Sequence, residues 1–259
     1  METKKTLFFS DVQEYYDRNN DKWSELVCKL YDKIEEGRKE KKIPVYFTKY
    51  RVKSINSIFL KLKRYSNNSL DQIDDYAGLR VACFFEDEVI ETLKFIENNL
   101  AEWGFEIKEV FGYCSNDKND KYHDYLTNQT TEPRKKIKIS FKKSGYRSIH
   151  YIVTDIATKY KVEIQLRTLL QDVWGEIEHT ISYKQGNIHP HIKESFLLLA
   201  NELSTKDRQL SYLKKIKDKE GSIELLSRRM MGLQPYLCFE DDIKPKFFEE
   251  NEKVKNLVQ

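Results

Sequence analysis

The clearest pattern in the chain is the alternation of apolar and polar residues over Lys159–Arg167. On one face of this predicted strand the residues are Val162, Ile164 and Leu166, and on the other they are Lys161, Glu163, Gln165 and Arg167. The segments Lys136–Lys142 and Tyr146–Thr154 alternate in the same way and are separated by turn residues. Leu79–Phe85 is a mostly apolar run typical of a buried strand. These segments predict at least four strands.

Helical spacing of apolar residues predicts helices before, between and after these strands. Two helices are expected between Phe8 and Lys42, with a break at Asn19–Asp21, and one is expected after a Ser54 cap. Others are expected at Glu86–Glu102, after Thr168, and at Ile192–Lys219. The sequence therefore predicts an α/β (α+β) fold with a mixed, mainly antiparallel central sheet flanked by helices.

The chain shows no internal repeat and no long linker rich in Gly, Ser or Pro. We predict a helical lead-in at residues 1–42, a catalytic domain at 43–186, and a helical extension and tail at 187–259. Residues 233–259 mix acidic and basic side chains and support no prediction of structure.

The polar faces of the three alternating strands gather unlike functional groups. They carry a carboxylate, an amide, an imidazole, a phenol and several cations, and a site for phosphates and a nucleobase needs all of these groups. A solvated face of an antiparallel sheet is the alternative interpretation. His150 by itself would be typical of an ordinary half-buried histidine.

Two carboxylates stand out among the basic residues. Asp75 lies at the entrance of the Leu79–Phe85 strand, and Glu163 lies on the polar face of the last strand. Magnesium bound to a nucleotide prefers one or two carboxylates together with phosphate oxygens. The alternative is that Asp74 and Asp75 only form a turn. No glycine-rich phosphate loop occurs, which argues against an ordinary kinase or GTPase.

Other histidines give only weak signals. His123 and Asp124 form a dipeptide without further spaced ligands, so we interpret them as part of a loop rather than a metal site. The pair His189 and His191 is equally unspecific.

Composition limits the class of protein. The 259 residues carry a formal net charge of +3, so any strongly cationic site must be local. The four cysteines are scattered without a C-x-x-C pair, which is typical of reduced thiols. No apolar run approaches the ~20 residues of a membrane-spanning helix. We expect a cytoplasmic protein without membrane association.

Four motifs follow one another along the chain: Arg51–Ile58, Asp75–Arg80, Gly145–His150 and Val162–Thr168. In this order they resemble the synthetase domain of the RelA/SpoT family, and Trp174–His179 is similar to the helix that follows in the family. The flanking helices are similar to those of small alarmone synthetases. The resemblance implies a nucleotidyltransferase-like fold.

The resemblance also implies a reaction, the transfer of the β,γ-pyrophosphoryl group of ATP to a ribose 3′-hydroxyl with release of AMP. The residues that it assigns to ATP are Arg51, Lys53, Lys61 and Arg80. It assigns the magnesium ion to Asp75 and Glu163, and it makes Glu163 the group that activates the hydroxyl.

On the acceptor side, the resemblance implies that Tyr146 stacks on the acceptor base. It places Lys142 and His150 near the acceptor phosphates, and it makes Gln165 and Arg167 supports of the polar floor. With GDP or GTP as acceptor the product would be (p)ppGpp, the alarmone of the stringent response.

The chain departs from the family pattern at Lys135–Ser144, where a lysine-rich stretch replaces the usual proline-containing approach to the Gly-Tyr motif. Lysines there would also suit the acceptor stem of tRNA. A toxin that transfers pyrophosphate to the 3′ end of tRNA is therefore the first alternative, and a non-catalytic nucleotide- or RNA-binding module is the second. A homo-oligomer and a cognate antitoxin both remain open as partners.

Overall fold

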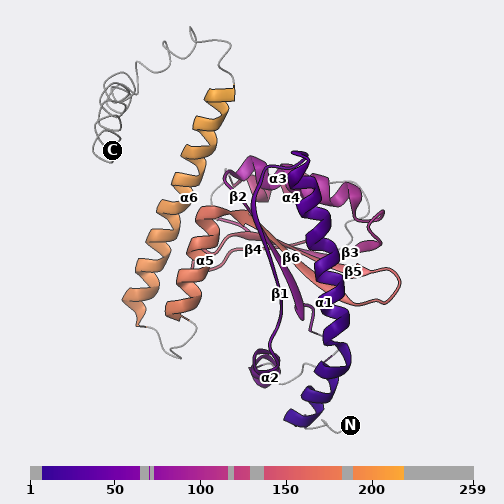
Figure 1. The fold of residues 1–259 in the computed structure, drawn as a ribbon. Helices are drawn as coiled ribbons and strands as arrows, with labels where there is room; N and C mark the ends of the chain where they lie inside the picture. The colour runs from indigo at the N-terminus through magenta and orange to yellow at the C-terminus, as the bar shows by residue number, and fades with distance from the viewer. Residues whose placement is uncertain are drawn as a thin grey trace, which may run out of the picture. The chain divides into compact units, whose positions relative to one another are not determined.

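The computed structural model describes residues 8–64, 70, 73–115, 120–128, 137–182 and 189–218 (Figure 1). The helices are α1 (Phe9–Lys39), α2 (Ile55–Arg64), α3 (Glu86–Asn99), α4 (Lys121–Thr127), α5 (Leu169–Ser182) and α6 (Pro190–Asp218). The strands are β1 (Val45–Val52), β2 (Ala77–Cys83), β3 (Phe105–Tyr113), β4 (Ile137–Ser140), β5 (Ser148–Asp155) and β6 (Lys161–Thr168).

The six strands form one sheet in the order β1-β2-β6-β5-β3-β4. The pairs β2–β6 and β3–β4 are parallel, and the other three are antiparallel. This confirms the predicted mixed, mainly antiparallel sheet. One expectation was incomplete, because β3 lies between β4 and β5, so the three alternating strands are not direct neighbours.

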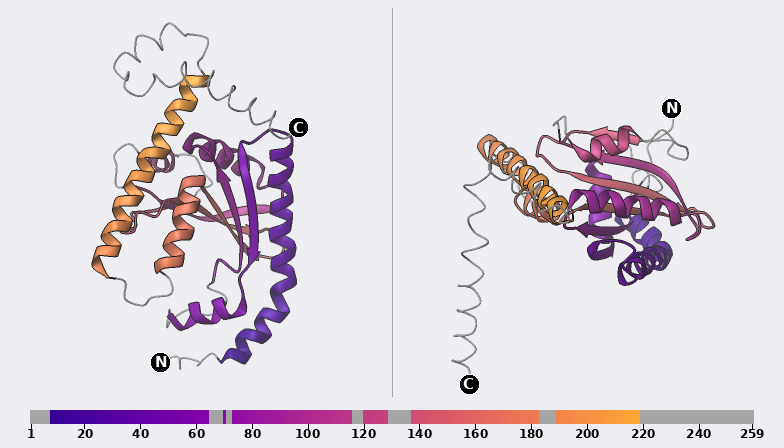
Figure 2. Two further views of the ribbon diagram at one scale, coloured as in Figure 1. Left: turned by 60° about the vertical axis from the view of Figure 1, so that its left-hand side comes forward. Right: turned by 90° about the horizontal axis from the view of Figure 1, so that it is seen from above.

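The apolar face of the sheet forms the core with α1 and α3. Val162, Ile164 and Leu166 of β6 are fully buried there, as the alternation predicts. From α1, Trp23 stacks on Tyr76 with ring centroids 4.1 Å apart. Figure 2 shows α1 running alongside the sheet in its left view. The side chains of the opposite, polar face of the sheet are therefore not part of this core and are free to form a site.

The predicted break in the first helical segment is wrong, because α1 runs without interruption past Asn19–Asp21. Polar residues of this kind often cap helices, but here tertiary contacts occupy the Asn19 side chain. Its amide donates to the Tyr15 carbonyl at 2.6 Å, and its oxygen accepts a hydrogen bond from the Tyr160 hydroxyl. A buried residue with both groups satisfied has no need to end the helix.

Several elements differ from the prediction. The apolar run at Leu79–Phe85 forms a strand two residues earlier, β2, and the alternation did not predict β1 or β3. His123 and Asp124 lie on the short helix α4 rather than in a loop. No group of three or more metal-binding side chains gathers among the described residues.

The cysteines that the structure describes, Cys28, Cys83 and Cys114, have free thiols, as predicted. Lys136 of the predicted strand, Cys238, Lys219 at the end of the last predicted helix and residues 233–259 lie outside the described residues.

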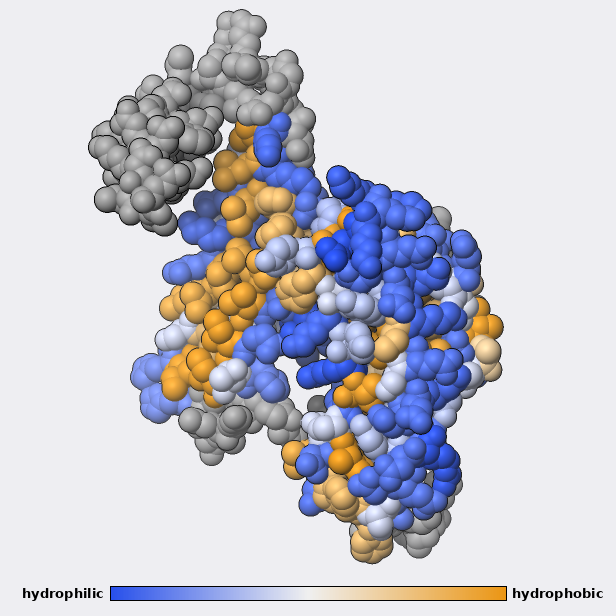
Figure 3. Space-filling view, in the orientation of Figure 1, coloured by the Kyte–Doolittle hydropathy of each residue, from blue (hydrophilic) through white to orange (hydrophobic). Residues whose placement is uncertain are grey.

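Both predicted C-terminal helices are present, as α5 and α6. On α5 the predicted apolar stripe exists, but Val173, Ile177 and Ile181 are 39–47% exposed. Figure 3 shows apolar side chains gathered along α5 and α6. None of the described helices has both the length and the apolar character needed to cross a membrane.

The chain forms two compact units, Met1–Ser211 and Tyr212–Gln259. The site below lies in the first. The predicted boundaries at residues 42 and 186 stay predictions.

Candidate active site

The register of the sheet brings polar residues from separate motifs into rows. Arg80 of β2 lies opposite Gln165 of β6, which lies opposite His150 of β5. Glu163 lies two residues before Gln165, opposite Gly78. Directly paired residues point to the same side of a sheet, so these side chains share its polar face. The structure thus brings together four of the predicted site residues.

Asp75 lies two residues before β2, at the entrance to this face, and two lysines hold its carboxylate. The Lys61 ammonium lies 2.7 Å from Oδ1, and the Lys53 ammonium contacts Oδ2. Burial favours the neutral acid, but the two lysines outweigh it and hold the pKa of Asp75 below its usual value. Burial also lowers the pKa of Lys53. Asp75 is therefore an ionised carboxylate between two cations, not only part of a turn.

Glu163 is the second carboxylate of the site, and each of its oxygens accepts one hydrogen bond. His150 Nδ1 lies 2.9 Å from Oε1, and Gln165 Nε2 donates to Oε2 at 2.7 Å. Burial raises the pKa of Glu163 and the negative charge of Asp75 adds to this, but the bonds from His150 and Gln165 leave it below the ordinary value. Each carboxylate oxygen keeps a lone pair, so Glu163 can still accept a proton or bind a cation.

A chain of hydrogen bonds connects Glu163 to Tyr146. The Tyr146 hydroxyl lies 3.1 Å from His150 Nε2, and Arg167 Nη1 donates to that hydroxyl oxygen at 3.3 Å. Burial raises the pKa of Tyr146, so its hydroxyl keeps its proton and can donate it. When His150 Nε2 accepts that proton, Nδ1–H donates to Glu163 Oε1.

Both ring nitrogens of His150 are thereby occupied within the protein, and His150 is only 7% exposed. In this arrangement the imidazole orients Glu163. Its predicted contact with acceptor phosphates stays a prediction.

Tyr113, the last residue of β3, is a member of the site that the sequence did not reveal. Its ring lies 5.5 Å from Tyr146 and 4.8 Å from His150, measured between centroids, and both contacts are edge-to-face. The Lys142 ammonium lies 4.7 Å from the centre of the Tyr113 ring. Tyr113 could have been found from the sequence only if β3 had been predicted. The register of β3 places Tyr113 opposite Ser148, two residues from Tyr146.

Helix α5 contributes two further carboxylates that were not predicted. Arg80 contacts the Glu176 carboxylate and lies 3.2 Å from that of Asp172. Arg167 Nη2 lies 2.8 Å from the same Asp172 oxygen. Asp172 therefore connects the two arginines of the polar face. In contrast, the Arg51 side chain is exposed, and it makes no hydrogen bond or ion pair with any residue that the structure describes.

The donor set suits a magnesium–polyphosphate complex. Asp75 and Glu163 are both ionised, and the negative charge of Asp75 acts on the Glu163 carboxylate. Two carboxylates without further ligands are a poor site for a bare metal, but they match magnesium that takes its other ligands from phosphates and water. Lys53, Lys61 and Arg80 provide the positive charge that phosphates require.

Comparisons with known proteins agree with this geometry. The model of the "Region found in RelA / SpoT proteins" matches residues 50–188. Among curated proteins of Bacillus subtilis (strain 168), the GTP pyrophosphokinase YjbM is 31% identical over 180 residues, which cover 66% of this chain and 72% of YjbM. The GTP pyrophosphokinase YwaC is 30% identical over 158 residues, 57% of this chain and 62% of YwaC.

Among solved structures, small alarmone synthetase 1 from Bacillus subtilis aligns with a TM-score of 0.62 and 25% identity. The alignment covers 80% of this chain and 99% of that one.

Proposed function

The chain belongs to the RelA/SpoT family, and we propose that it is a GTP pyrophosphokinase of the small alarmone synthetase type. It transfers the β,γ-pyrophosphate of ATP to the 3′-hydroxyl of GDP or GTP. The observation that carries this proposal is the ionised, half-buried Glu163 carboxylate, which His150 and Gln165 orient by one hydrogen bond each. The names of YwaC and YjbM support the choice of reaction.

On the donor side, Lys53, Lys61 and Arg80 bind the triphosphate of ATP. Lys53 and Lys61 already contact Asp75, so they are held at the entrance of the polar face before ATP arrives. Arg80 must exchange its contact with Glu176 for a phosphate oxygen. Preorganised cations lower the cost of concentrating the negative charge of a nucleotide.

In the chemical step, the 3′-oxygen of the acceptor attacks the β-phosphorus of ATP. A new oxygen–phosphorus bond forms, the bond from the β-phosphorus to the α,β-bridging oxygen breaks, and AMP leaves with that oxygen. Glu163 accepts the proton of the attacking hydroxyl, which requires its carboxylate to be ionised beforehand. His150 and Gln165 keep the carboxylate in one orientation during this transfer.

Asp75 and Glu163 would hold the magnesium ion. When bound, the ion neutralises phosphate charge and stabilises the charge that develops on AMP. The fit rests on two ionised carboxylates, with Lys53 and Lys61 in contact with Asp75 and with Arg80 on the polar face that carries Glu163.

On the acceptor side, Tyr146 and Tyr113 offer two aromatic rings in contact, next to the exposed ammonium of Lys142. A purine base stacks on such rings, and the ammonium pairs with a phosphate. A free guanine nucleotide fits this chemistry. The same lysine would also meet an RNA backbone, so tRNA enters the test as a competing acceptor.

The test offers γ-labelled ATP and magnesium to the purified protein with GDP, GTP or bulk tRNA as acceptor. We expect label on the guanine nucleotides, and loss of transfer by a factor of about 100 or more in Glu163→Gln. Glu106→Gln is the matched control, because Glu106 is an exposed glutamate of β3 and should leave transfer unchanged.

Label on tRNA alone would show that tRNA, and not a guanine nucleotide, is the acceptor. No label on any acceptor would favour a non-catalytic binding module. Equal transfer by wild type and Glu163→Gln would refute Glu163 as the base.

A further inference from the structure

The residue on each side of Tyr146 is held by helix α6. Before it, Gly145 has φ +77°, and a Cβ at this position would come within 2.3 Å of the Ala200 Cβ on α6. After it, Arg147 Nη1 donates to the Ser204 hydroxyl of α6 at 3.1 Å. The backbone at Tyr146 is thus fixed by neighbours whose contacts lie outside the polar face.

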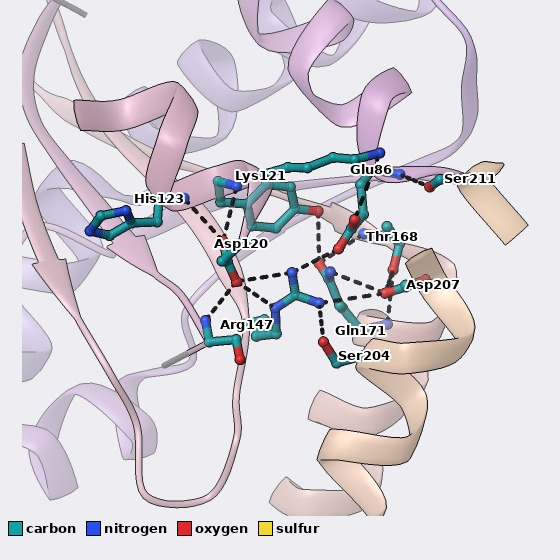
Figure 4. Close-up of polar contacts among 12 residues, drawn as sticks. Glu86, Asp120, Lys121, His123, Arg147, Thr168, Gln171, Ser204, Asp207 and Ser211 are labelled. Atoms are coloured by element: carbon teal, nitrogen blue, oxygen red, sulfur yellow. Dashed lines mark hydrogen bonds and ion pairs between the residues drawn. The ribbon is translucent and has the colours of Figure 1, made fainter. Parts of the chain in front are cut away.

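Arg147 belongs to a buried charge cluster, which we define as Glu86, Asp120, Arg147 and Asp207 (Figure 4). Each member is at most 5% exposed. Arg147 Nη2 lies 2.7 Å from the Glu86 carboxylate and 3.1 Å from that of Asp120. A guanidinium held by carboxylates from two other elements has little freedom to move.

The same helix holds the end of β6. The Asp207 carboxylate accepts hydrogen bonds from Thr168 Oγ1 at 2.8 Å and from Gln171 Nε2 at 3.1 Å (Figure 4). Thr168 directly follows Arg167, the residue that donates to the Tyr146 hydroxyl. Tyr146 and Arg167 thus face the site, while the residues after them, Arg147 and Thr168, contact α6.

One stripe of α6 makes all of these contacts. Ala200, Ser204, Asp207 and Ser211 follow at spacings of four, three and four residues, so they share a face of the helix. The last of them accepts a hydrogen bond at 3.3 Å from the Glu86 amide, at the start of α3. None of them contacts the carboxylates of the proposed catalytic step.

We propose that the α6 stripe is a positioning clamp for the acceptor base: by fixing Gly145, Arg147 and Thr168, it sets where Tyr146 and Arg167 meet the acceptor. This inference rests on the proposed function in one respect, the role of Tyr146 as the ring that stacks on the base. Ser204 and Asp207 are positioning residues, because they act through Arg147 and Thr168 and do not touch substrate. The clamp predicts that changes in α6 weaken acceptor binding selectively.

The test compares Ser204→Ala with Thr205→Ala. Both remove one hydroxyl from neighbouring positions of α6. Ser204 accepts a hydrogen bond from Arg147, whereas the exposed Thr205 hydroxyl donates to the Asn201 carbonyl of its own helix. The second clamp variant is Asp207→Asn, which keeps the volume but replaces one of the two carboxyl oxygens by an NH2 donor. Thermal melting of each variant first establishes that it is folded.

The first readout needs no substrate. Hydrogen–deuterium exchange at the amides of residues 145–148 should accelerate about three- to tenfold in Ser204→Ala and Asp207→Asn, and not in Thr205→Ala. Unchanged exchange in the folded clamp variants would overturn the clamp, whatever the activity of the protein.

The second readout is nucleotide binding and steady-state transfer with GDP and ATP. We expect the Kd and KM for GDP to rise about three- to tenfold in the clamp variants, with the KM for ATP and the kcat at saturating GDP within about twofold of wild type. In a Tyr146→Ala background, Ser204→Ala should add no further rise in the Kd for GDP.

The outcomes separate the clamp from the proposed function. Equal rises in KM for ATP and GDP would reduce α6 to a general structural role and refute the selective clamp. Accelerated exchange without any change in GDP binding would refute the connection to the acceptor base. A wild-type protein that binds and modifies no acceptor would instead refute the proposed function, while the exchange experiment would still decide the clamp.

Discussion

Asp207 should make the free energy of unfolding fall between pH 5 and pH 8, and Asp207→Asn should remove that fall. Asp207 is 1% exposed, and its burial, together with the negative charge of Glu86, raises its pKa to about 7. In the unfolded chain the carboxyl returns to its ordinary pKa of 3.8. At pH 5 the folded protein therefore holds a proton that the unfolded chain has released.

The magnitude follows from the two pKa values. Their difference of about 3 corresponds to roughly 4 kcal/mol, at about 1.4 kcal/mol for each tenfold change in proton affinity. A raised pKa stabilises the fold fully below the unfolded value of 3.8, and this stabilisation is lost as the pH rises through about 7. Between pH 5 and pH 8 the loss amounts to about 3 kcal/mol.

The assay is urea denaturation of wild type and Asp207→Asn at several pH values and constant ionic strength. Other titrating groups affect both proteins alike, so the informative quantity is the difference between their free energies of unfolding. This difference should shift by about 3 kcal/mol in favour of the variant from pH 5 to pH 8. In Glu86→Gln the fall should move to lower pH, because the charge that raises the pKa of Asp207 is gone.

Parallel stability curves for wild type and Asp207→Asn would refute the reasoning. They would mean that Asp207 is ionised throughout this range, so that Arg147, Thr168 and Gln171 outweigh its burial.

Two further predictions concern the site. His150→Ala removes the hydrogen bond that lowers the pKa of Glu163, so that pKa should rise. The acidic limb of the profile of kcat/KM against pH should then move to higher pH, and an unmoved limb would show that His150 does not control the base. Glu176→Gln removes the carboxylate that competes with the ATP phosphates for Arg80, so the KM for ATP should fall about two- to fivefold. A rise in the KM for ATP would instead make Glu176 part of the ATP site.

The sequence predicted the polar face of β6 well because that strand alternates strictly and both of its neighbours pair with it in regular register. The prediction failed at β3, where the register shifts between Ile107 and Glu109. An irregularity of this kind adds a residue to one strand and breaks the two-residue period on which the prediction depends. Because β3 was not predicted, Tyr113 was not identified as a residue of the site.

The buried charge cluster had no local signal at all. Glu86 begins a helix, Asp120 caps another, Arg147 precedes a strand and Asp207 lies within the last helix, so each residue has an ordinary explanation in its own segment. Only the tertiary structure brings them together. The family motif Gly145–His150 includes Arg147, but spacing along the chain does not tell which of its residues face the substrate and which face α6.

The position of β6 in the sheet determines when the site is completed as the chain is synthesised. Among the strands that the structure describes, β6 is the last to be translated, and it lies between β2 and β5. Until it emerges from the ribosome, the paired strands β1 and β2 are not joined to the group β5–β3–β4, and Asp75 acts without Glu163. A nascent chain, or one truncated before Lys161, therefore lacks the second carboxylate and should not catalyse the proposed transfer.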